Sequence, residues 1–255
     1  MSAASTRGYA LALGDDSLVM AQRLGEWIAS APQIEEDIAL GNLALDQLGQ
    51  ARALLSYAGS LFDPARSEDD LAYLRDADSF RNVLLVERPW GAGTRDFGVA
   101  MARLLLVSTY QLLLYDDLRT SSDSTLAAIA AKAVKEVDYH NDHATRWVLR
   151  LGDGTEESHH RLQAAFDAEW PHLEELFDGS FVDSAALASG VAVDPASLRV
   201  PVLERVGAVL SEATLVLPAV SPALGRGRWG EHTEHLRELL ADMQGLARAH
   251  PGVAW

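Results

Sequence analysis

Apolar residues recur at steps of three and four along nearly the whole of this 255-residue chain, and no segment sustains the alternation of a strand. A period of 3.6 residues places such side chains on one face of an α-helix. We expect helices at 15–30, 33–61, 67–75, 97–118, 125–151, 155–177, 184–188, 201–216 and 229–249. No repeat, low-complexity tract or shift in composition marks a linker between them. The pattern predicts an all-α fold, with residues 1–255 forming a single domain.

The helix expected at 33–61 carries apolar residues along one face and small residues between them. The apolar residues are Ile34, Ile38, Leu45, Leu48, Leu55 and Phe62, and the small ones are Gly41, Ala44, Gly49 and Ala51. Small side chains let neighbouring helices approach closely, because the distance between packed helices depends on the side chains at the contact. We therefore expect this helix to pack closely against others.

The segment 97–118 is the most apolar part of the chain, and Arg103 is its one charged residue before the last turn. About 20 apolar residues are enough to cross a bilayer. Ser108, Thr109 and Gln111 interrupt the segment, however, and neither end carries an excess of basic residues that would orient it. A helix that is apolar on all sides also suits the centre of a bundle. We predict a buried central helix and no membrane association.

Charge and cysteine content exclude several classes of function. The chain has 21 Lys and Arg against 37 Asp and Glu, a net charge of −16, whereas proteins that follow nucleic-acid phosphates are basic. It has no cysteine, which excludes disulfides, thiolate zinc sites, iron–sulfur clusters and cysteine nucleophiles. Residues 1–12 lack the basic and apolar regions of a signal peptide. We expect a cytoplasmic protein that does not bind nucleic acid.

Long helices around an apolar one raise the question of a carboxylate-bridged di-metal site. Such sites take one Glu from each of two helices and a Glu-x-x-His from each of two others. Three residues turn a helix by about 300°, so the carboxylate and the imidazole project from one face and share a metal. Oxygen and nitrogen ligands of this kind suit iron or manganese. A chain with such a site would carry the Glu-x-x-His spacing on two helices.

The two helices best placed to carry these ligands lack that spacing, and we expect no complete ligand pair. In the helix at 33–61, Gln47 and Gln50 have the right separation, but neutral amides bring no charge to a di-metal centre. In the helix at 125–151, Val137 stands three residues before His140. Gln47, Gln50, Val137 and His140 therefore have the pattern of a degenerate ligand set. Whether they bind a small molecule is left open.

Two carboxylates keep a metal site open as an alternative. Glu136 precedes His140 by four residues, and Glu26 lies on the first expected helix, where it has room to face inward. A buried polar network of Glu136, His140 and Gln47 without metal is the simpler interpretation. A stand-alone di-metal oxidase or metal store is the alternative. Most acidic residues are interpreted as a solvated exterior.

The remaining candidate residues predict no chemistry. His159 and His160 stand at a helix start and are expected on the surface, and His232 and His235 are expected at a helix cap or an interface. No acid–base pair or phosphate loop is evident at the other candidates, which are Asp46, Asp116, Asp117 and the run Gly91-Ala92-Gly93. We therefore predict no catalytic, cofactor-binding or metal-binding residue.

Motifs spread over nearly the whole chain resemble a known family. They are Leu13-Gly14-Asp15, Gln22 to Trp27, Leu48-Gly49-Gln50-Ala51-Arg52, Leu55 to Ala58, Leu84-Leu85-Val86-Glu87, Lys132 to Glu136, Tyr139-His140, Arg150 to Thr155, His232 to Leu236 and Pro251-Gly252-x-x-Trp255. In these motifs the chain resembles the C-subunit family of ring 1,2-phenylacetyl-CoA epoxidase, a multicomponent monooxygenase of bacterial phenylacetate degradation.

The resemblance implies a ferritin-like helical bundle with additional helices. It also implies a non-catalytic, structural subunit without a cofactor, which pairs with the related catalytic A subunit. In this family the A subunit holds the di-iron centre, activates oxygen and binds the acyl-CoA. A hetero-oligomer is therefore expected, with a homodimer as the alternative for the isolated chain.

Tryptophans are enriched at interfaces, and each of the six is a candidate for the interface or the core: Trp27, Trp90, Trp147, Trp170, Trp229 and Trp255. A helical adaptor outside phenylacetate degradation is a further alternative.

Overall fold

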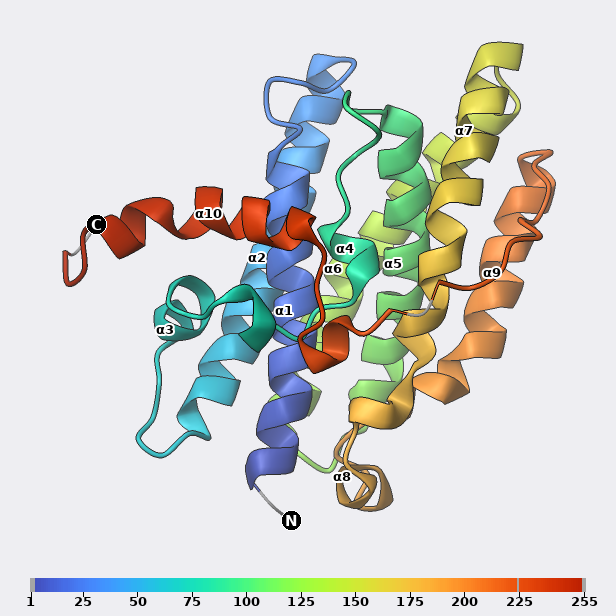
Figure 1. Cartoon of the computed structure of the whole chain (residues 1–255). Coiled ribbons are helices and arrows are strands. Elements are labelled where there is room, and N and C mark those ends of the chain that lie inside the picture. The colour runs from blue at the N-terminus through green and yellow to red at the C-terminus, as the bar shows by residue number, and fades with distance from the viewer. Residues whose placement is uncertain (1–2, 224, 254–255) are drawn as a thin grey trace. The chain divides into compact units, whose positions relative to one another are not determined.

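The computed structural model describes residues 3–223 and 225–253, which form helices joined by short connections (Figure 1). The α-helices are α1 (Ala3–Gly25), α2 (Ile34–Ser60), α3 (Glu68–Tyr73), α4 (Leu84–Glu87), α5 (Phe97–Leu118), α6 (Ser124–Gly152), α7 (Glu156–Glu169), α8 (Ser184–Ala188), α9 (Arg199–Glu212) and α10 (Glu234–Ala249). Short 3₁₀ helices are η1 (Ala77–Ser79), η2 (Trp170–Phe177), η3 (Gly179–Phe181), η4 (Pro195–Leu198) and η5 (Gly227–Trp229). Extended pairing in the described part of the chain is limited to one bridge, between Arg226 and Glu231. The prediction of an all-α fold is confirmed, and the helices are consistent with a ferritin-like fold.

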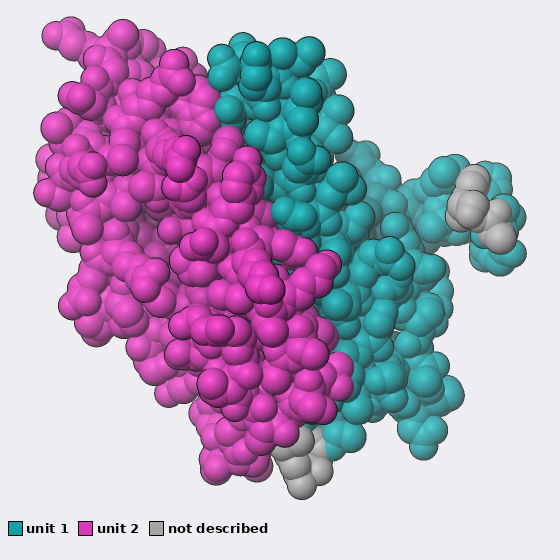
Figure 2. All heavy atoms as spheres, turned by 180° about the vertical axis from the view of Figure 1, so that it is seen from behind, with its two compact units in different colours: residues 1–88, 226–255 teal, residues 89–225 magenta. Residues whose placement is uncertain are grey.

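The chain divides into two compact units, coloured separately in Figure 2. The first contains the described residues of 1–88 and 226–255, and therefore α1 to α4 with α10. The second contains the described residues of 89–225, and therefore α5 to α9. That residues 1–255 act as a single domain stays a prediction.

In the first unit, α1 packs along α2. Gly14 lies at their close approach, because a Cβ atom there would stand 2.9 Å from Leu55 Cδ2. The predicted start of the first helix at Asp15 is wrong, since α1 already begins at Ala3. Alanines at 3, 4, 10 and 12 explain the extension, because alanine has the highest helix propensity. The predicted end at Ser30 is also late, since α1 ends at Gly25.

In the second unit, α5 begins and ends at the predicted residues and packs on α6, α7 and α9. It is the one helix in the described ranges that is long and apolar enough to cross a membrane by length and composition, with a mean hydropathy of 1.6 over its most apolar window. In the structure, 78% of that window is buried. Burial against protein accounts for its apolar sequence, as predicted for a central helix.

Side-chain caps and a proline set several helix ends. The Asp123 carboxylate accepts the amide hydrogens of Thr125 and Leu126 at the start of α6, both at 3.0 Å. The helix predicted at 155–177 is α-helical up to Glu169 and continues as the 3₁₀ helix η2. Pro171 stands at that transition. The α-helix does not continue there because proline lacks the amide hydrogen that the next α-helical hydrogen bond needs. A proline inside a helical pattern predicts a kink, and in the structure the disruption at Pro171 is a change of helix type.

The spacing of Ser67 and Asp70 in the sequence predicts a capping box, and the two residues form one at the start of α3. The Asp70 amide donates to Ser67 Oγ at 3.0 Å, and the Ser67 amide donates to an Asp70 carboxylate oxygen at 2.8 Å. The Ser67 amide and hydroxyl hold the pKa of Asp70 below its ordinary value of 3.8. Because the folded pKa is depressed, this contact stabilises the fold above pH 3.8 and is lost as the pH falls through the lower folded value.

Replacing Asp70 with alanine should therefore lower the free energy of unfolding by about 1 kcal/mol at neutral pH, the usual effect of losing a cap. The difference from the unmodified chain should shrink in urea titrations below pH 3.8, where the carboxyl becomes protonated. Asp69→Ala is the matched control, since Asp69 is an exposed acid of the same helix turn outside the capping box. Equal losses for the two variants would contradict a role for the cap.

Candidate functional site

The four positions of the degenerate ligand set lie on buried helix faces. Gln47 and Gln50 lie one turn apart on α2 and are 1% and 3% exposed, and Val137 and His140 are fully buried on α6. Each pair therefore has the inward orientation that a ligand pair needs. The α2 pair belongs to the first unit and the α6 pair to the second. That all four meet in one pocket stays a prediction.

The two carboxylates that kept a metal site open form ion pairs within their own helical segments. Glu26 accepts from Arg23 Nη1 at 2.5 Å, just after α1 ends. Glu136 lies 3.1 Å from Lys132 Nζ, one turn earlier on α6. Both carboxylates remain partly exposed, at 24% and 20% of the side chain. Each carboxylate is therefore paired with a basic residue of its own segment, and neither ion pair includes a residue of the degenerate ligand set.

The Glu-x-x-His spacing does occur C-terminal to α6, outside the two helices that are best placed to carry ligands. It occurs at Glu156 to His159, Glu157 to His160 and Glu169 to His172. The first two pairs lie at the exposed start of α7, where His159 Nδ1 bonds the Gly152 carbonyl at 2.8 Å and His160 is exposed as predicted. In the third pair, Glu169 accepts from Arg103 at 2.8 Å and its helix ends before His172. None of these spacings forms a di-metal motif.

His232 belongs to a buried network around Glu87 in the first unit. Its Nδ1 lies 2.7 Å from Glu87 Oε2, and its Nε2 lies 3.1 Å from the Phe80 carbonyl. Glu87 also accepts from the Asn82 side chain and from the amide and hydroxyl of Thr233, at 2.7–3.0 Å. The network joins the segment before α10 to α4. The hydrogen bonds of His232 and Thr233 to Glu87 hold the N-terminus of α10 next to α4.

His235 lies apart from this network, so the two histidines do not form a ligand pair. Its side chain is 46% exposed and its Nδ1 is 3.5 Å from Glu238, whereas the His232 side chain is 1% exposed. The prediction that this motif belongs to a helix cap or an interface is consistent with its place at the N-terminus of α10.

Two buried aspartates of α1 hold a second network in the first unit. Arg75 pairs with both oxygens of Asp15, and the Arg81 amide donates to the same carboxylate at 2.8 Å. Asp16 accepts from Arg228 Nη2 at 2.6 Å and from the Val83 amide at 2.9 Å. Burial raises the pKa of Asp16 above its ordinary value of 3.8, and the Arg228 charge offsets part of that rise. Asp15 thus balances the charge of Arg75, and Asp16 balances that of Arg228 in η5. Through these contacts and the Val83 amide, α1 is connected to η1, α4 and η5.

Arg103, the one charge within the apolar helix, forms the corresponding buried pair of the second unit. Its Nε donates to Glu169 at 2.8 Å, and its Nη2 donates to the Pro89 carbonyl at 2.8 Å. The guanidinium also stacks over the Trp90 ring, with its Cζ 4.5 Å from the ring centroid. Arg103 is fully buried, and the Glu169 side chain is 2% exposed. A lone charge in an apolar sequence was the signal for this pair, because a buried charge needs a partner.

Most acidic residues in the described part of the chain are exposed or half-buried, as interpreted from the sequence, and these networks involve the exceptions. Buried acids occur in both units, and they are Asp15, Asp16, Glu36, Glu87, Glu169 and Glu175. Four of them pair with arginine or histidine, namely Asp15, Asp16, Glu87 and Glu169. No group of three or more His, Asp or Glu residues with metal-site geometry occurs within residues 3–223 and 225–253. These four buried carboxylates are therefore engaged with basic side chains. The side chains at Gln47, Gln50, Val137 and His140 do not fit a di-iron centre, because none of them is a carboxylate.

The other aspartates considered from the sequence are not buried, whereas the tryptophans range from buried to exposed. Asp116 and Asp117 are exposed, and Asp116 pairs with Arg119. Asp46 is half-buried on α2. The tryptophans divide into buried Trp27 and Trp90, half-buried Trp147 and Trp170, and Trp229, which is 53% exposed. Trp255 lies outside the described residues.

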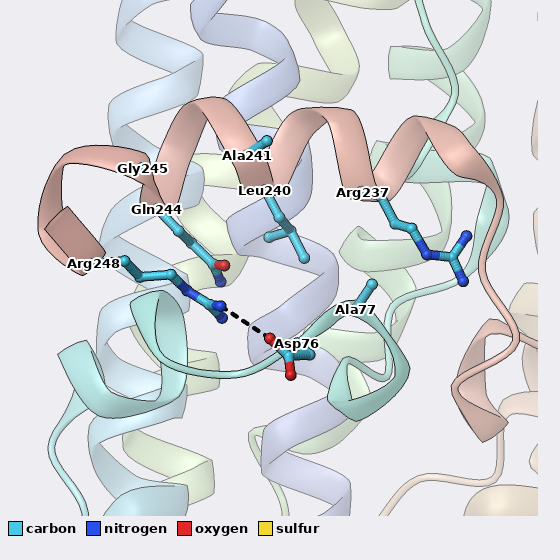
Figure 3. A pocket seen from close by; sticks show the side chains of 8 residues that line it. All are labelled: Asp76, Ala77, Arg237, Leu240, Ala241, Gln244, Gly245 and Arg248. Atoms are coloured by element: carbon cyan, nitrogen blue, oxygen red, sulfur yellow. Dashed lines mark hydrogen bonds and ion pairs between the residues drawn. The ribbon is translucent and has the colours of Figure 1, made fainter.

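Three hollows lie in the described part of the first unit, and their lining residues form no catalytic constellation. One, of about 300 Å³, runs along α10 next to η1, and Figure 3 shows Arg248 and Gln244 on its α10 side. Arg248 donates to Asp76 at 2.9 Å, and Arg237 pairs with Glu234 at 3.2 Å. The charged side chains that line this groove therefore all take part in ion pairs. Two larger hollows, of about 420 and 550 Å³, are mainly apolar in lining.

The comparisons with known proteins agree with the resemblance seen in the motifs. The model of a family described as phenylacetic acid catabolic protein matches residues 2–255. The C subunit of 1,2-phenylacetyl-CoA epoxidase from Escherichia coli K12 is 44% identical over 247 residues, which are 97% of this chain and 98% of that protein. Such similarity over the full length is carried by both units and leaves no large segment unmatched. The chain belongs to the phenylacetic acid catabolic protein family.

Proposed function

We propose that the chain is the non-catalytic structural subunit of a multicomponent 1,2-phenylacetyl-CoA epoxidase in aerobic phenylacetate catabolism. In this role it pairs with, and stabilises, the di-iron catalytic A subunit. The observation that carries the proposal is the 44% identity to a C subunit over 97% of the chain. A cytoplasmic location and the lack of nucleic-acid and membrane partners are part of the same proposal.

The side chains of the chain support a role without metal. The helix faces that would present ligands carry Gln47, Gln50 and Val137, and His140 is the one residue of ligand type among these positions. Neutral amides and a valine do not balance the charge of two metal ions. In this proposal no chemical step of the epoxidation takes place on this chain.

Two alternatives remain distinct from this proposal. A stand-alone di-metal oxidase would depend on Glu26, Glu136 and His140, but both of these carboxylates already form ion pairs with basic residues. A helical adaptor outside phenylacetate degradation would not account for the match of the family along 2–255.

Co-expression with the catalytic subunit of the same genome tests the proposal. We expect one stable complex in size-exclusion chromatography with light scattering at micromolar concentration. Iron analysis should find metal in the complex in proportion to the catalytic subunit, and substoichiometric metal in the isolated chain. Separate elution of the two proteins would contradict the structural role. Two irons per isolated chain would favour the oxidase instead.

A further inference from the structure

Helix α2 has two apolar faces, and one of them is exposed. Leu40, Leu43 and Leu54 are fully buried on the first face. The residues of the second face are Ile34, Ile38, Leu45 and Leu48, which are 72%, 60%, 65% and 37% exposed. The stripe predicted from the sequence therefore points to solvent over most of its length, and of that set Leu55 is buried. Four large exposed aliphatic side chains on one helix face are more than the scattered apolar residues of an ordinary surface.

The spacing of this exposed stripe is that of a helix-packing seam. Ile34, Ile38, Leu45 and Leu48 follow one another at steps of four, seven and three, and Gly41 stands at the remaining position of the pattern. Alternating steps of three and four form the a and d positions along which two helices pack side by side. We call Ile34, Ile38, Gly41, Leu45 and Leu48 the α2 seam. The spacing of the α2 seam is therefore suited to packing against a second helix that runs alongside α2.

Gly41 has no function in the packing of the described chain. A Cβ atom added there would meet no heavy atom within 4 Å among the described residues. A glycine inside a helix weakens it relative to alanine. Gly14, by contrast, is needed where α1 meets α2. A glycine in the middle of an exposed apolar seam is explained if a helix from another molecule crosses close to α2 there.

The α2 seam borders a continuous apolar hollow of the first unit. A groove of about 420 Å³ is lined by Ile38, Gly41, Leu45 and Leu48 of the seam, together with residues of α1, α3 and α10. The adjoining hollow of about 550 Å³ shares Tyr73 and Met243 with it and adds Leu74 and Leu246, each about 60% exposed. Figure 1 shows α2, α3 and α10, which provide these walls, and α3 contacts both of the others. The exposed apolar surface therefore continues beyond one helix.

Charge decides which helix fits this surface. Residues 34–51 of α2 include four acidic residues and no basic one. Of these acids, Glu35, Asp37 and Asp46 are exposed or half-buried, and Asp69 and Asp70 line the adjoining hollow. A second copy of the chain would place acidic flanks against acidic flanks, which is unfavourable. A helix of a different protein with Lys or Arg beside its apolar ridge would be complementary.

We propose that the α2 seam docks an amphipathic helix of a different subunit, whose apolar ridge is flanked by basic residues. This inference rests on the proposed function, since it names the surface through which a hetero-oligomer forms. The partner ridge packs along Ile38, Leu45 and Leu48, passes close over Gly41, and places its basic flanks against Glu35, Asp37 and Asp46.

Three variants of the full-length chain test the seam against the purified catalytic subunit. Leu45→Ser removes a central contact, Gly41→Leu blocks the close approach, and Asp46→Lys reverses a flanking charge. Leu45→Ser and Gly41→Leu should each raise the Kd by about 30-fold or more, as for residues that dominate an interface. Asp46→Lys should weaken binding mainly at low salt, because exposed charges are screened. Val200→Ser, at a 60% exposed valine of the second unit, is the matched control and should leave the Kd unchanged.

Separate measurements distinguish the docking surface from the fold and from the proposed function. The isolated Leu45→Ser chain should keep a thermal midpoint close to that of the unmodified chain, because the site faces solvent. The midpoint of the isolated Gly41→Leu chain should equal or exceed it, because leucine favours helix more than glycine does. If the unmodified chain and the seam variants bind the catalytic subunit equally well, the seam is not the docking surface and the proposed function stands. If the unmodified chain does not bind, the proposed function fails and the inference with it. If the variants only abolish self-association of the isolated chain, the occupant is a second copy and the proposal is overturned.

Discussion

The Glu87→Ala variant is expected to be less stable than the unmodified chain by about 3–5 kcal/mol, because it removes the shared acceptor of several buried donors, each of which costs about 1–3 kcal/mol when left unpaired. The Glu87 side chain is fully buried and accepts from His232, Asn82 and Thr233. Alanine leaves these buried donors without their acceptor, and unmet buried donors are costly. Urea unfolding followed by circular dichroism would measure the loss.

Two companion variants separate the network from the general effect of removing a carboxylate. Glu87→Gln keeps the volume and one acceptor oxygen, so its stability should lie between those of the alanine variant and the unmodified chain. Glu238→Ala removes a 69% exposed carboxylate near His235 and should change stability by no more than about 0.5 kcal/mol. A Glu87→Ala loss as small as that of Glu238→Ala would show that the network does not hold α10 in place.

The Arg103→Met variant is expected to lose a similar amount, about 3–5 kcal/mol, because the Glu169 carboxylate would remain buried without its main counter-charge. Arg103 also donates to the Pro89 carbonyl and stacks on Trp90, so methionine loses those contacts too. Urea unfolding of the full chain measures this variant beside the unmodified protein.

The double variant Arg103→Met with Glu169→Met should be more stable than either single variant. Apolar residues of similar volume often replace a buried pair with little loss. Arg161→Met is the matched control, because its pair with Asp96 at 2.8 Å is partly exposed and should contribute less than about 1 kcal/mol. A double variant that loses the sum of both single effects would contradict the coupling of Arg103 and Glu169.

Local patterns were sufficient to predict most helices. The helix at 97–118 agrees with α5 at both ends, and the capping box at Ser67 places α3 correctly. The first helix was predicted too short because Ala3 to Gly14 has no strong amphipathic pattern, although it favours helix by composition. Periodicity detects helices with one apolar face and is weak where a helix is buried on several sides.

The candidate site was predictable only in part. The sequence predicted that Gln47, Gln50 and Val137 do not form a metal-ligand set, because that prediction depends on side-chain chemistry alone. It did not predict the Glu87–His232 or Asp16–Arg228 pairs, whose members are 145 and 212 residues apart. Contacts at such distances along the chain leave no periodic signal, and the one hint was Arg103 inside an apolar segment.

The sequence by itself determined the helical class, most helix boundaries and the family, because periodicity, caps and rare-residue motifs are local properties. Tertiary structure alone decided which apolar face of α2 became core and which faced solvent. Both faces have helical spacing. Only the folded unit, in which α2 packs along α1 and Leu40, Leu43 and Leu54 are buried, selects one of them. It also decided which acids are neutralised in the interior, because an acid and its arginine meet only after the chain has folded.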